Sequence, residues 1–210
     1  TVTVAQVNDD PAAVADSAVT NEDTAKTIDV LANDTDVDTN TTLNQGALHY
    51  RSEFSISLES ITEPTHGSIE VADGKIVYTP DTNWYGTDTF TYWLLDGHGS
   101  SAEGTVTVTV NSVNDLPVFD TAPVDMELTE DLSDGSSSLT VSDIETVAES
   151  LSVTAVNSSN TALVALSDVA VTAGAGGSRT VTVNPRDDQN GTAVITLRVT
   201  DADGGHSETT

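Results

Sequence analysis

The chain has 210 residues, of which 34 are aspartate or glutamate and 6 are lysine or arginine, so its formal net charge is -28 at pH 7. This charge excludes nucleic acid as a partner, because the phosphate backbone would be repelled, and it favours the recruitment of cations. Cysteine is absent, so neither disulfides nor thiolate metal sites hold the fold together. No stretch approaches the roughly 18 apolar residues of a membrane-spanning helix, which argues against membrane insertion.

The sequence repeats itself after about 100 residues. Residues 1–4 return as residues 107–110, and residues 7–11 return as residues 113–117 with one substitution. Such a period indicates tandem modules and not one large domain. We therefore predict the last strand and linker of a preceding repeat at residues 1–10, a first repeat at residues 11–110, a linker at residues 111–116, and a second repeat at residues 117–210 whose final strand is missing.

Turn signals divide the first repeat into seven short strands, in which apolar residues recur at every second position. In chain order these are residues 13–19, 25–31, 54–61, 67–71, 75–79, 87–95 and 104–110. Seven short strands without helical periodicity are typical of an immunoglobulin-like two-layer sandwich. The Cys-Trp-Cys core of antibody domains is absent.

Several short motifs resemble the cadherin-like tandem repeats of giant bacterial adhesins and surface proteins. In the first repeat these motifs are residues 8–11 (Asn-Asp-Asp-Pro), 21–24 (Asn-Glu-Asp-Thr), 31–38, 78–80 and 85–92. In the second repeat, residues 141–145, 159–164 and 190–192 resemble a sister subtype. The resemblance implies an all-β chain made of two tandem seven-stranded Greek-key β-sandwiches, cadherin-like or immunoglobulin-like, arranged end to end.

The same resemblance implies a non-enzymatic role outside the cell. We expect a calcium-stiffened structural or adhesive segment of a large bacterial cell-surface or secreted adhesin, which acts in cell adhesion and biofilms. Its partners would be neighbouring repeats of the same chain and the glycans or proteins of host or environmental surfaces. The sequence contains no nucleophile elbow, phosphate-binding glycine loop or paired histidine motif, and we predict that the chain is not an enzyme.

Carboxylates alternate in the loop that contains Asp34, Asp36 and Asp38. In an extended loop they project to the same side and can share one cation. The loop is not an EF-hand, because Thr39 and Gln45 stand where glycine and a bidentate glutamate are needed. Hard oxygen ligands in irregular geometry favour Ca²⁺, although solvated acidic loops remain the alternative interpretation.

The alternation of strands places acidic groups at both ends of the first repeat. At the upstream end we expect a set made of Asn8, Asp9, Asp10, Asp34, Asp36, Asp38 and Asp96. At the junction of the two repeats we expect a set made of Glu22, Asp23, Asn114, Asp115, Asp143, Glu145, Asp201 and Asp203, with Asp81 as a further candidate. The resemblance to cadherin-like modules implies calcium at these positions.

A carbohydrate-binding module of a secreted polysaccharide-degrading or surface protein is the alternative function. It would use Trp84 and Trp93 as sugar platforms, together with an insertion that contains His49, Tyr50 and Arg51. The competing interpretation is that Trp93 covers a neighbouring strand or linker, that Trp84 packs the turn beside Tyr85, and that the insertion is a tolerated surface loop.

Overall fold

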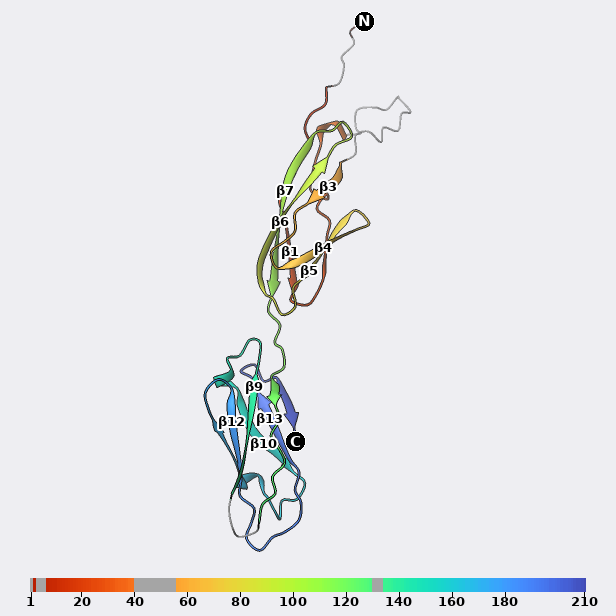
Figure 1. Ribbon diagram of the computed structural model, residues 1–210. Helices are drawn as coiled ribbons and strands as arrows, with labels where there is room; N and C mark the ends of the chain where they lie inside the picture. The colour runs from red at the N-terminus through yellow and green to blue at the C-terminus, as the bar shows by residue number, and fades with distance from the viewer. Residues whose placement is uncertain (1, 3–6, 40–55, 130–133) are drawn as a thin grey trace. The chain divides into compact units, whose positions relative to one another are not determined.

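The computed structural model describes residues 2, 7–39, 56–129 and 134–210. The chain divides into two compact units, Thr1–Val113 and Asn114–Thr210, each of which is a β-sandwich (Figure 1). The division falls inside the linker predicted at residues 111–116, whereas the strand predicted at residues 1–4 lies, apart from Val2, outside the described residues. No helix in the described part of the chain is long and apolar enough to cross a membrane.

Unit 1 has two sheets. Its described strands and its one described 3-10 helix are β1 (Asp16–Asn21), β2 (Lys26–Ile28), η1 (Val37–Thr39), β3 (Ser57–Ile61), β4 (Gly67–Ala72), β5 (Lys75–Pro80), β6 (Gly86–Leu95) and β7 (Ser101–Asn111). One sheet has the order β1-β7-β6-β3 and the other the order β2-β5-β4. β1 runs parallel to β7, and the other neighbours are antiparallel. The predicted all-β sandwich is confirmed, with a strand at each of the seven predicted places.

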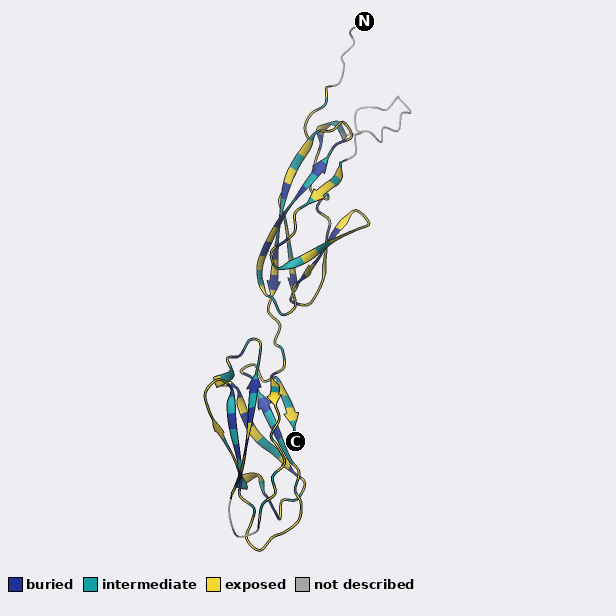
Figure 2. Ribbon diagram, in the orientation of Figure 1, coloured by how far each residue is buried: buried dark blue, intermediate teal, exposed yellow. Residues whose placement is uncertain are grey.

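The core of unit 1 follows from the two-residue alternation of the long strands. On β6, Phe90, Tyr92 and Leu94 are buried, while Thr87 and Thr89 are exposed. On β7 the valines are buried in the same way, and Ile76 and Tyr78 of β5 face them from the other sheet. Figure 2 shows the alternation as bands of colour along the strands. Burying each of these side chains contributes roughly 1.5–3 kcal/mol relative to exposure.

A buried tyrosine hydroxyl fixes the loop that follows β2. Tyr92 donates to Asp34 Oδ2 at 2.9 Å, and the Val14 amide donates to Asp34 Oδ1 at 2.7 Å. Burial, and then the hydrogen bond to Asp34, raise the pKa of Tyr92, so the hydroxyl stays a donor at neutral pH. The loop residues just beyond Asp34 are thereby held against the sheet.

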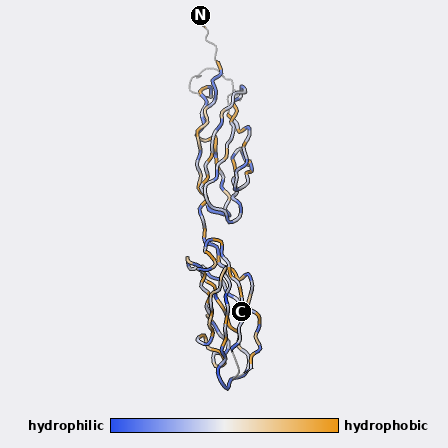
Figure 3. Tube along the Cα trace, turned by 60° about the vertical axis from the view of Figure 1, so that its left-hand side comes forward, coloured by the Kyte–Doolittle hydropathy of each residue, from blue (hydrophilic) through white to orange (hydrophobic). Residues whose placement is uncertain are grey.

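Unit 2 is also a sandwich of two sheets. Its described strands and 3-10 helices are β8 (Val118–Thr121), β9 (Gly135–Ser142), η4 (Ala148–Ser150), β10 (Ser152–Ser158), η5 (Leu166–Asp168), β11 (Val169–Ala173), β12 (Ser178–Val183), β13 (Ile195–Thr200) and β14 (His206–Thr209). The sheet orders are β11-β12-β9-β8 and β10-β13-β14. Leu139, Val141, Val181, Leu197 and Val199 form the centre of its core. Apolar positions alternate with hydrophilic ones along both units (Figure 3).

The sequence predicts no final strand in the second repeat, and the structure shows a short strand, β14, at its last residues. β14 pairs antiparallel with β13, from Leu197 opposite Thr209 to Thr200 opposite His206. The prediction started the equivalent strand of unit 1 at Gly104, whereas the β6 and β7 hairpin pairs from Leu95 opposite Ser101. Residues 101–103 therefore extend β7 upstream of its predicted start, and β14 aligns with residues 101–104 of β7.

A buried arginine fixes the segment around η4. Arg179 is 2% exposed, and its guanidinium donates to the carbonyl oxygens of Ala148, Leu151 and Ser178 at 2.8, 2.7 and 2.9 Å. Since guanidinium is a rigid fork of donors, it holds these carbonyls in one geometry. The acidic loop that precedes Ala148 is therefore anchored at its downstream end.

Candidate metal-binding sites

In each unit, two residues precede the first strand and contact the acidic loops; we call residues 8–9 and 114–115 the entry segments. In unit 1 the entry segment is hydrogen-bonded to the loop that follows β6. The side-chain amide of Asn8 donates to Asp96 Oδ2 at 2.9 Å and to Ser100 Oγ at 3.3 Å. Asp96 Oδ1 accepts the backbone amides of His98, Gly99 and Ser100 at 2.8, 2.7 and 2.9 Å. The Asn8 amide, followed by these backbone donors and opposed by burial, lowers the pKa of Asp96. Asp96 is therefore a firmly ionised carboxylate that orients Asn8.

The next residue of the entry segment is tied to the loop that follows β2. The Asp9 amide donates to Asp38 Oδ2 at 2.7 Å, and the Asp38 amide donates to Asp36 Oδ1 at 2.7 Å. Asp36 is 6% exposed. Asn8 Oδ1 is buried without a hydrogen-bond partner among the described residues. The segment thus brings one unpartnered oxygen into a set of carboxylates.

Unit 2 repeats the first of these arrangements. The side-chain amide of Asn114 donates to Asp201 Oδ2 at 2.9 Å. Asp201 Oδ1 accepts the backbone amides of Asp203 and Gly205 at 2.9 and 2.8 Å. The pKa of Asp201 is lowered, first by Asn114 and then by backbone donors, with burial opposing them. Asn114 and Asp201 therefore correspond to Asn8 and Asp96.

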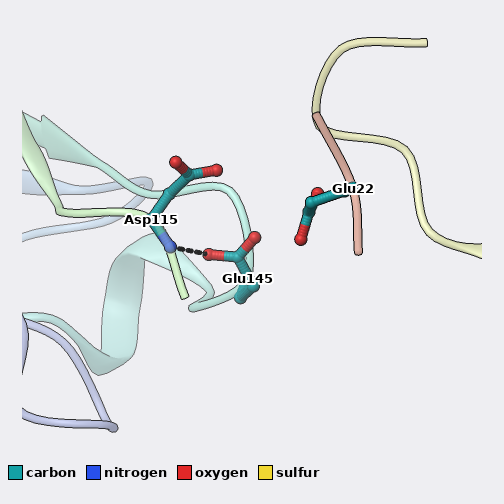
Figure 4. Close-up of side chains that lie close together, drawn as sticks. All are labelled: Glu22, Asp115 and Glu145. Carbon is teal, nitrogen blue, oxygen red and sulfur yellow. Dashed lines mark hydrogen bonds between the residues drawn. The ribbon is translucent and has the colours of Figure 1, made fainter. Parts of the chain in front are cut away.

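Unit 2 also repeats the second arrangement. The Asp115 amide donates to Glu145 Oε2 at 3.0 Å (Figure 4). Asp143 Oδ1 in turn accepts the amides of Glu145 and Thr146 at 3.1 and 2.7 Å. The second oxygens of these carboxylates, Asp115 Oδ2, Asp143 Oδ2 and Glu145 Oε1, are all buried without a hydrogen-bond partner in the described part of the chain.

Three buried carboxylate oxygens without partners within one unit are unusual. Buried polar atoms are nearly always hydrogen-bonded, and each exception needs an explanation such as an ion. An uncompensated buried carboxylate is costly, and neighbouring carboxylates also repel one another. These oxygens have the chemistry of a site for a hard divalent cation. Asp115, Asp143 and Glu145 could hold such a cation in unit 2, and Asn8, Asp9, Asp36 and Asp38 are the corresponding residues of unit 1.

Glu22 lies in unit 1, at the turn after β1. It is 3% exposed, its Oε1 accepts the Val113 amide, and its Oε2 is buried without a partner among the described residues. Figure 4 shows its carboxylate. Glu22 therefore fixes the last residue of unit 1 and keeps one oxygen available. The neighbouring Asp23 is exposed, has a φ of 57°, and accepts the Asn83 amide at 3.1 Å, so it stabilises a turn.

Other predicted ligands are not part of these sets. Both carboxylate oxygens of Asp34 accept hydrogen bonds from Tyr92, and one also accepts the Val14 amide. The side chains of Asp10, Asp81 and Asp203 are exposed, and Asp203 contributes only its backbone amide to Asp201.

The aromatic candidates differ from one another. Trp84 stacks on His66 with ring centroids 4.4 Å apart and planes 9° apart, and it packs against the core of unit 1. That face of its ring is therefore not open to a sugar. Trp93 is half-buried on β6, opposite Glu103 of β7. His49, Tyr50 and Arg51 lie outside the described residues.

Sequence reasoning missed two aspartates in unit 1, one of them buried and the other half-buried. Asp88 is 2% exposed and accepts the Tyr78 hydroxyl at 3.2 Å and the His66 amide at 2.9 Å. Asp16 has a buried Oδ2 without a partner among the described residues, and burial raises its pKa. The signal for Asp88 was present, because it shares the inward face of β6 with Phe90.

The bacterial Ig domain family matches residues 8–109. This match runs from Asn8, the first residue of the acidic set, into β7. Unit 1 is similar to a bacterial Ig domain. No curated protein matches the chain significantly.

The two units have the fold of tandem cadherin domains. PcdhgB3 EC1-4 is 15% identical with a TM-score of 0.60, and the match covers 98% of this chain and 49% of that one. Protocadherin gamma B2 extracellular cadherin domains 3-6 are 15% identical with a TM-score of 0.56, over 95% and 45% of the two chains. The protocadherin gamma B4 extracellular domain is 18% identical with a TM-score of 0.55, over 98% and 32%. The chain thus spans less than half the length of each, and the likeness is one of fold.

Proposed function

We propose that the chain is a non-catalytic, calcium-binding structural or adhesive segment of a bacterial surface or secreted protein. The observation that carries the proposal is the acidic set that recurs in the two units. Each unit ties an Asn-Asp pair to two acidic loops. Among the described residues, the set of unit 1 leaves one buried oxygen without a partner and the set of unit 2 leaves three.

Calcium fits this set better than other metals. All the side chains that could bind offer oxygen, and neither set includes a cysteine or histidine ligand, which zinc would favour. The donors come from irregular loops, a geometry that calcium accepts and that magnesium, with its strict octahedron, does not. A divalent ion would also offset part of the net charge of -28.

Calcium in this role would fix the entry segment of each unit. Residues 8–9 and 114–115 are held by carboxylates of two loops, and those carboxylates repel one another when no cation lies among them. We therefore propose that the two-unit chain serves as a stiffened spacer outside the cell. Its neighbours would be further repeats of the same protein. The parent protein would contact surface glycans or proteins.

Calorimetric titration of the metal-free chain with CaCl₂ tests the proposal. We expect at least one calcium ion for each acidic set, little heat with MgCl₂, and a higher melting temperature in calcium than in EGTA. One site at 100 times its Kd stabilises the fold by about 2.7 kcal/mol. Melting curves that coincide in calcium, magnesium and EGTA would exclude the proposal.

A further inference from the structure

One side of unit 1 is bordered by two unpaired strand edges. β3 ends the sheet β1-β7-β6-β3, and β4 ends the sheet β2-β5-β4, so each has a free edge among the described strands. The two strands lie on the same side of the unit (Figure 1). An open groove of about 410 Å³ lies between them, lined by Leu58, Ile61, Ile69 and Val71 and by Glu59, Ser60 and Glu63. We call it the β3/β4 groove.

The floor of the groove is continuous with the core. Leu58, Ile61 and Ile69 are half-buried and pack against the core of unit 1, whereas Val71 is 53% exposed. Clefts of 300–1,000 Å³ are typical of binding pockets. The groove is therefore large enough for the apolar side chains of one added segment.

A second copy of the chain is not the occupant that the charges of β3 favour. The register of β3 against β6 shifts between Leu58 and Ser60, so Glu59 sits at a bulge, and an acidic side chain on an edge strand disfavours pairing with another acidic chain. Because each copy carries a net charge of -28, two copies would also repel one another. A partner with basic residues would instead be attracted to Glu59 and Glu63.

We propose that the β3/β4 groove binds an extended peptide of a partner protein, in which apolar residues alternate with lysine or arginine. The peptide would add to the edge of β3 by backbone hydrogen bonds. Its apolar residues, which recur every 6.6–6.8 Å on one face (about two residues of strand), would lie over Leu58, Ile61, Ile69 and Val71. Its basic residues would face Glu59 and Glu63. This adhesive surface is independent of the calcium proposal.

The test uses the full chain in calcium at about 0.15 M salt, where charges more than about 8 Å apart are screened. The probe is a fluorescent eight-residue peptide that alternates valine and lysine, and binding is followed by anisotropy. A serine-lysine peptide has the same charge without the apolar face, and a valine-lysine peptide with N-methyl groups on alternate amides cannot pair with a strand. We expect the unmodified valine-lysine peptide to bind at least tenfold more tightly than either control.

Matched substitutions place the site on the protein. V71K and E59K should each weaken binding at least fivefold. V19K and E103K change residues of the same types outside the groove, and Val19 is 56% exposed against 53% for Val71, so both should change binding less than twofold. Amide NMR shifts should concentrate in residues 57–63 and 67–72.

Several results would overturn the proposal. Equal binding of the valine-lysine and serine-lysine peptides would show attraction by charge alone. Amide shifts spread over other strands would place the peptide elsewhere. A concentration-dependent dimer that V71K but not V19K dissociates would identify a second copy as the occupant. If the valine-lysine peptide bound only after residues 42–53 were replaced by a glycine-serine linker, that segment of the chain itself would be identified as the occupant.

Discussion

Asp143→Asn separates ion binding from loop structure in unit 2. Asp143 Oδ1 accepts the amides of Glu145 and Thr146 at 3.1 and 2.7 Å, and an asparagine oxygen can accept both. Asp143 Oδ2 is the buried oxygen without a partner, and the substitution replaces it with an amide nitrogen that cannot bind a cation. The variant therefore keeps the turn and loses one ligand.

The size of the effect follows from linkage. Losing a residue that only supports a metal ligand lowers metal affinity 10- to 100-fold, and we take 100-fold for the loss of a ligand. At calcium 100 times the original Kd, the stabilisation then falls from about 2.7 to about 0.4 kcal/mol. For a domain of about 100 residues the lost 2.3 kcal/mol corresponds to a fall in melting temperature of roughly 9–18 °C.

Melting curves in calcium and in EGTA are the assay, and Asp168→Asn is the control. Asp168 also accepts a backbone amide, that of Ala165 at 2.9 Å, but its carboxylate pairs with Arg186 at 3.1 Å and lies outside the acidic set. Since exposed ion pairs contribute about 0–1 kcal/mol, the control should lose little stability, and equally in both media.

The melting temperature of Asp143→Asn should fall below that of the wild type in calcium but not in EGTA. In EGTA the wild-type protein keeps a buried charge beside Asp115 and Glu145, so neutralising Asp143 should leave stability unchanged or raise it. An equal loss of stability in calcium and in EGTA would show that Asp143 only supports the loop, and the assignment of a cation to unit 2 would be refuted.

Three further predictions concern the supports of the unit 1 and unit 2 sets. Gly104→Ala would place a Cβ 2.2 Å from the Tyr92 ring, so it should destabilise unit 1 by about 1–3 kcal/mol or more and weaken calorimetric calcium binding by unit 1 alone. Asp16→Asn removes a carboxylate whose pKa is raised by burial; it should raise the melting temperature at pH 7, and the difference should vanish at low pH, where Asp16 is protonated in both states. The pKa values of Asp96 and Asp201 are lowered in the folded state. The ionised carboxylates therefore stabilise the fold fully above the unfolded pKa of about 3.9, and this contribution is lost as the pH falls below it. In melting curves in EGTA, D96N and D201N should approach the wild type as the pH falls through this range.

The fold could be predicted because each of its determinants is local. Strict alternation along residues 87–95 and 104–110 defined the long strands, and the tandem period defined two units. The acidic set of unit 1 also followed from alternation, since loops after every second strand meet at one end of a sandwich. In the structure Asn8, Asp9, Asp36, Asp38 and Asp96 are joined by hydrogen bonds.

What could not be predicted depends on which atom faces which neighbour. Asp34 alternates with Asp36 and Asp38 in the sequence. In the structure, however, its carboxylate accepts a hydrogen bond from the hydroxyl of Tyr92, which lies on a distant strand. Trp84 remains a candidate sugar platform on the sequence alone, because nothing in the sequence indicates that it stacks on His66. Long-range pairs of this kind are determined by tertiary packing and leave no periodic signal.

The two units hold their entry segments in the same way. In unit 1 Ala12 and Thr35 form an antiparallel bridge, in which each backbone amide donates to the other residue's carbonyl oxygen, at 2.8 and 3.1 Å. In unit 2 Val118 pairs antiparallel with Ser142 at the corresponding place. Both Asn-to-Asp hydrogen bonds measure 2.9 Å, and in both units the amide of the following aspartate donates to an acidic side chain at 2.7 or 3.0 Å. The shared backbone bridge accounts for these recurring hydrogen bonds. It does not account for the buried oxygens of the two sets that have no partner among the described residues, and a hard divalent cation is the ligand that such oxygens fit.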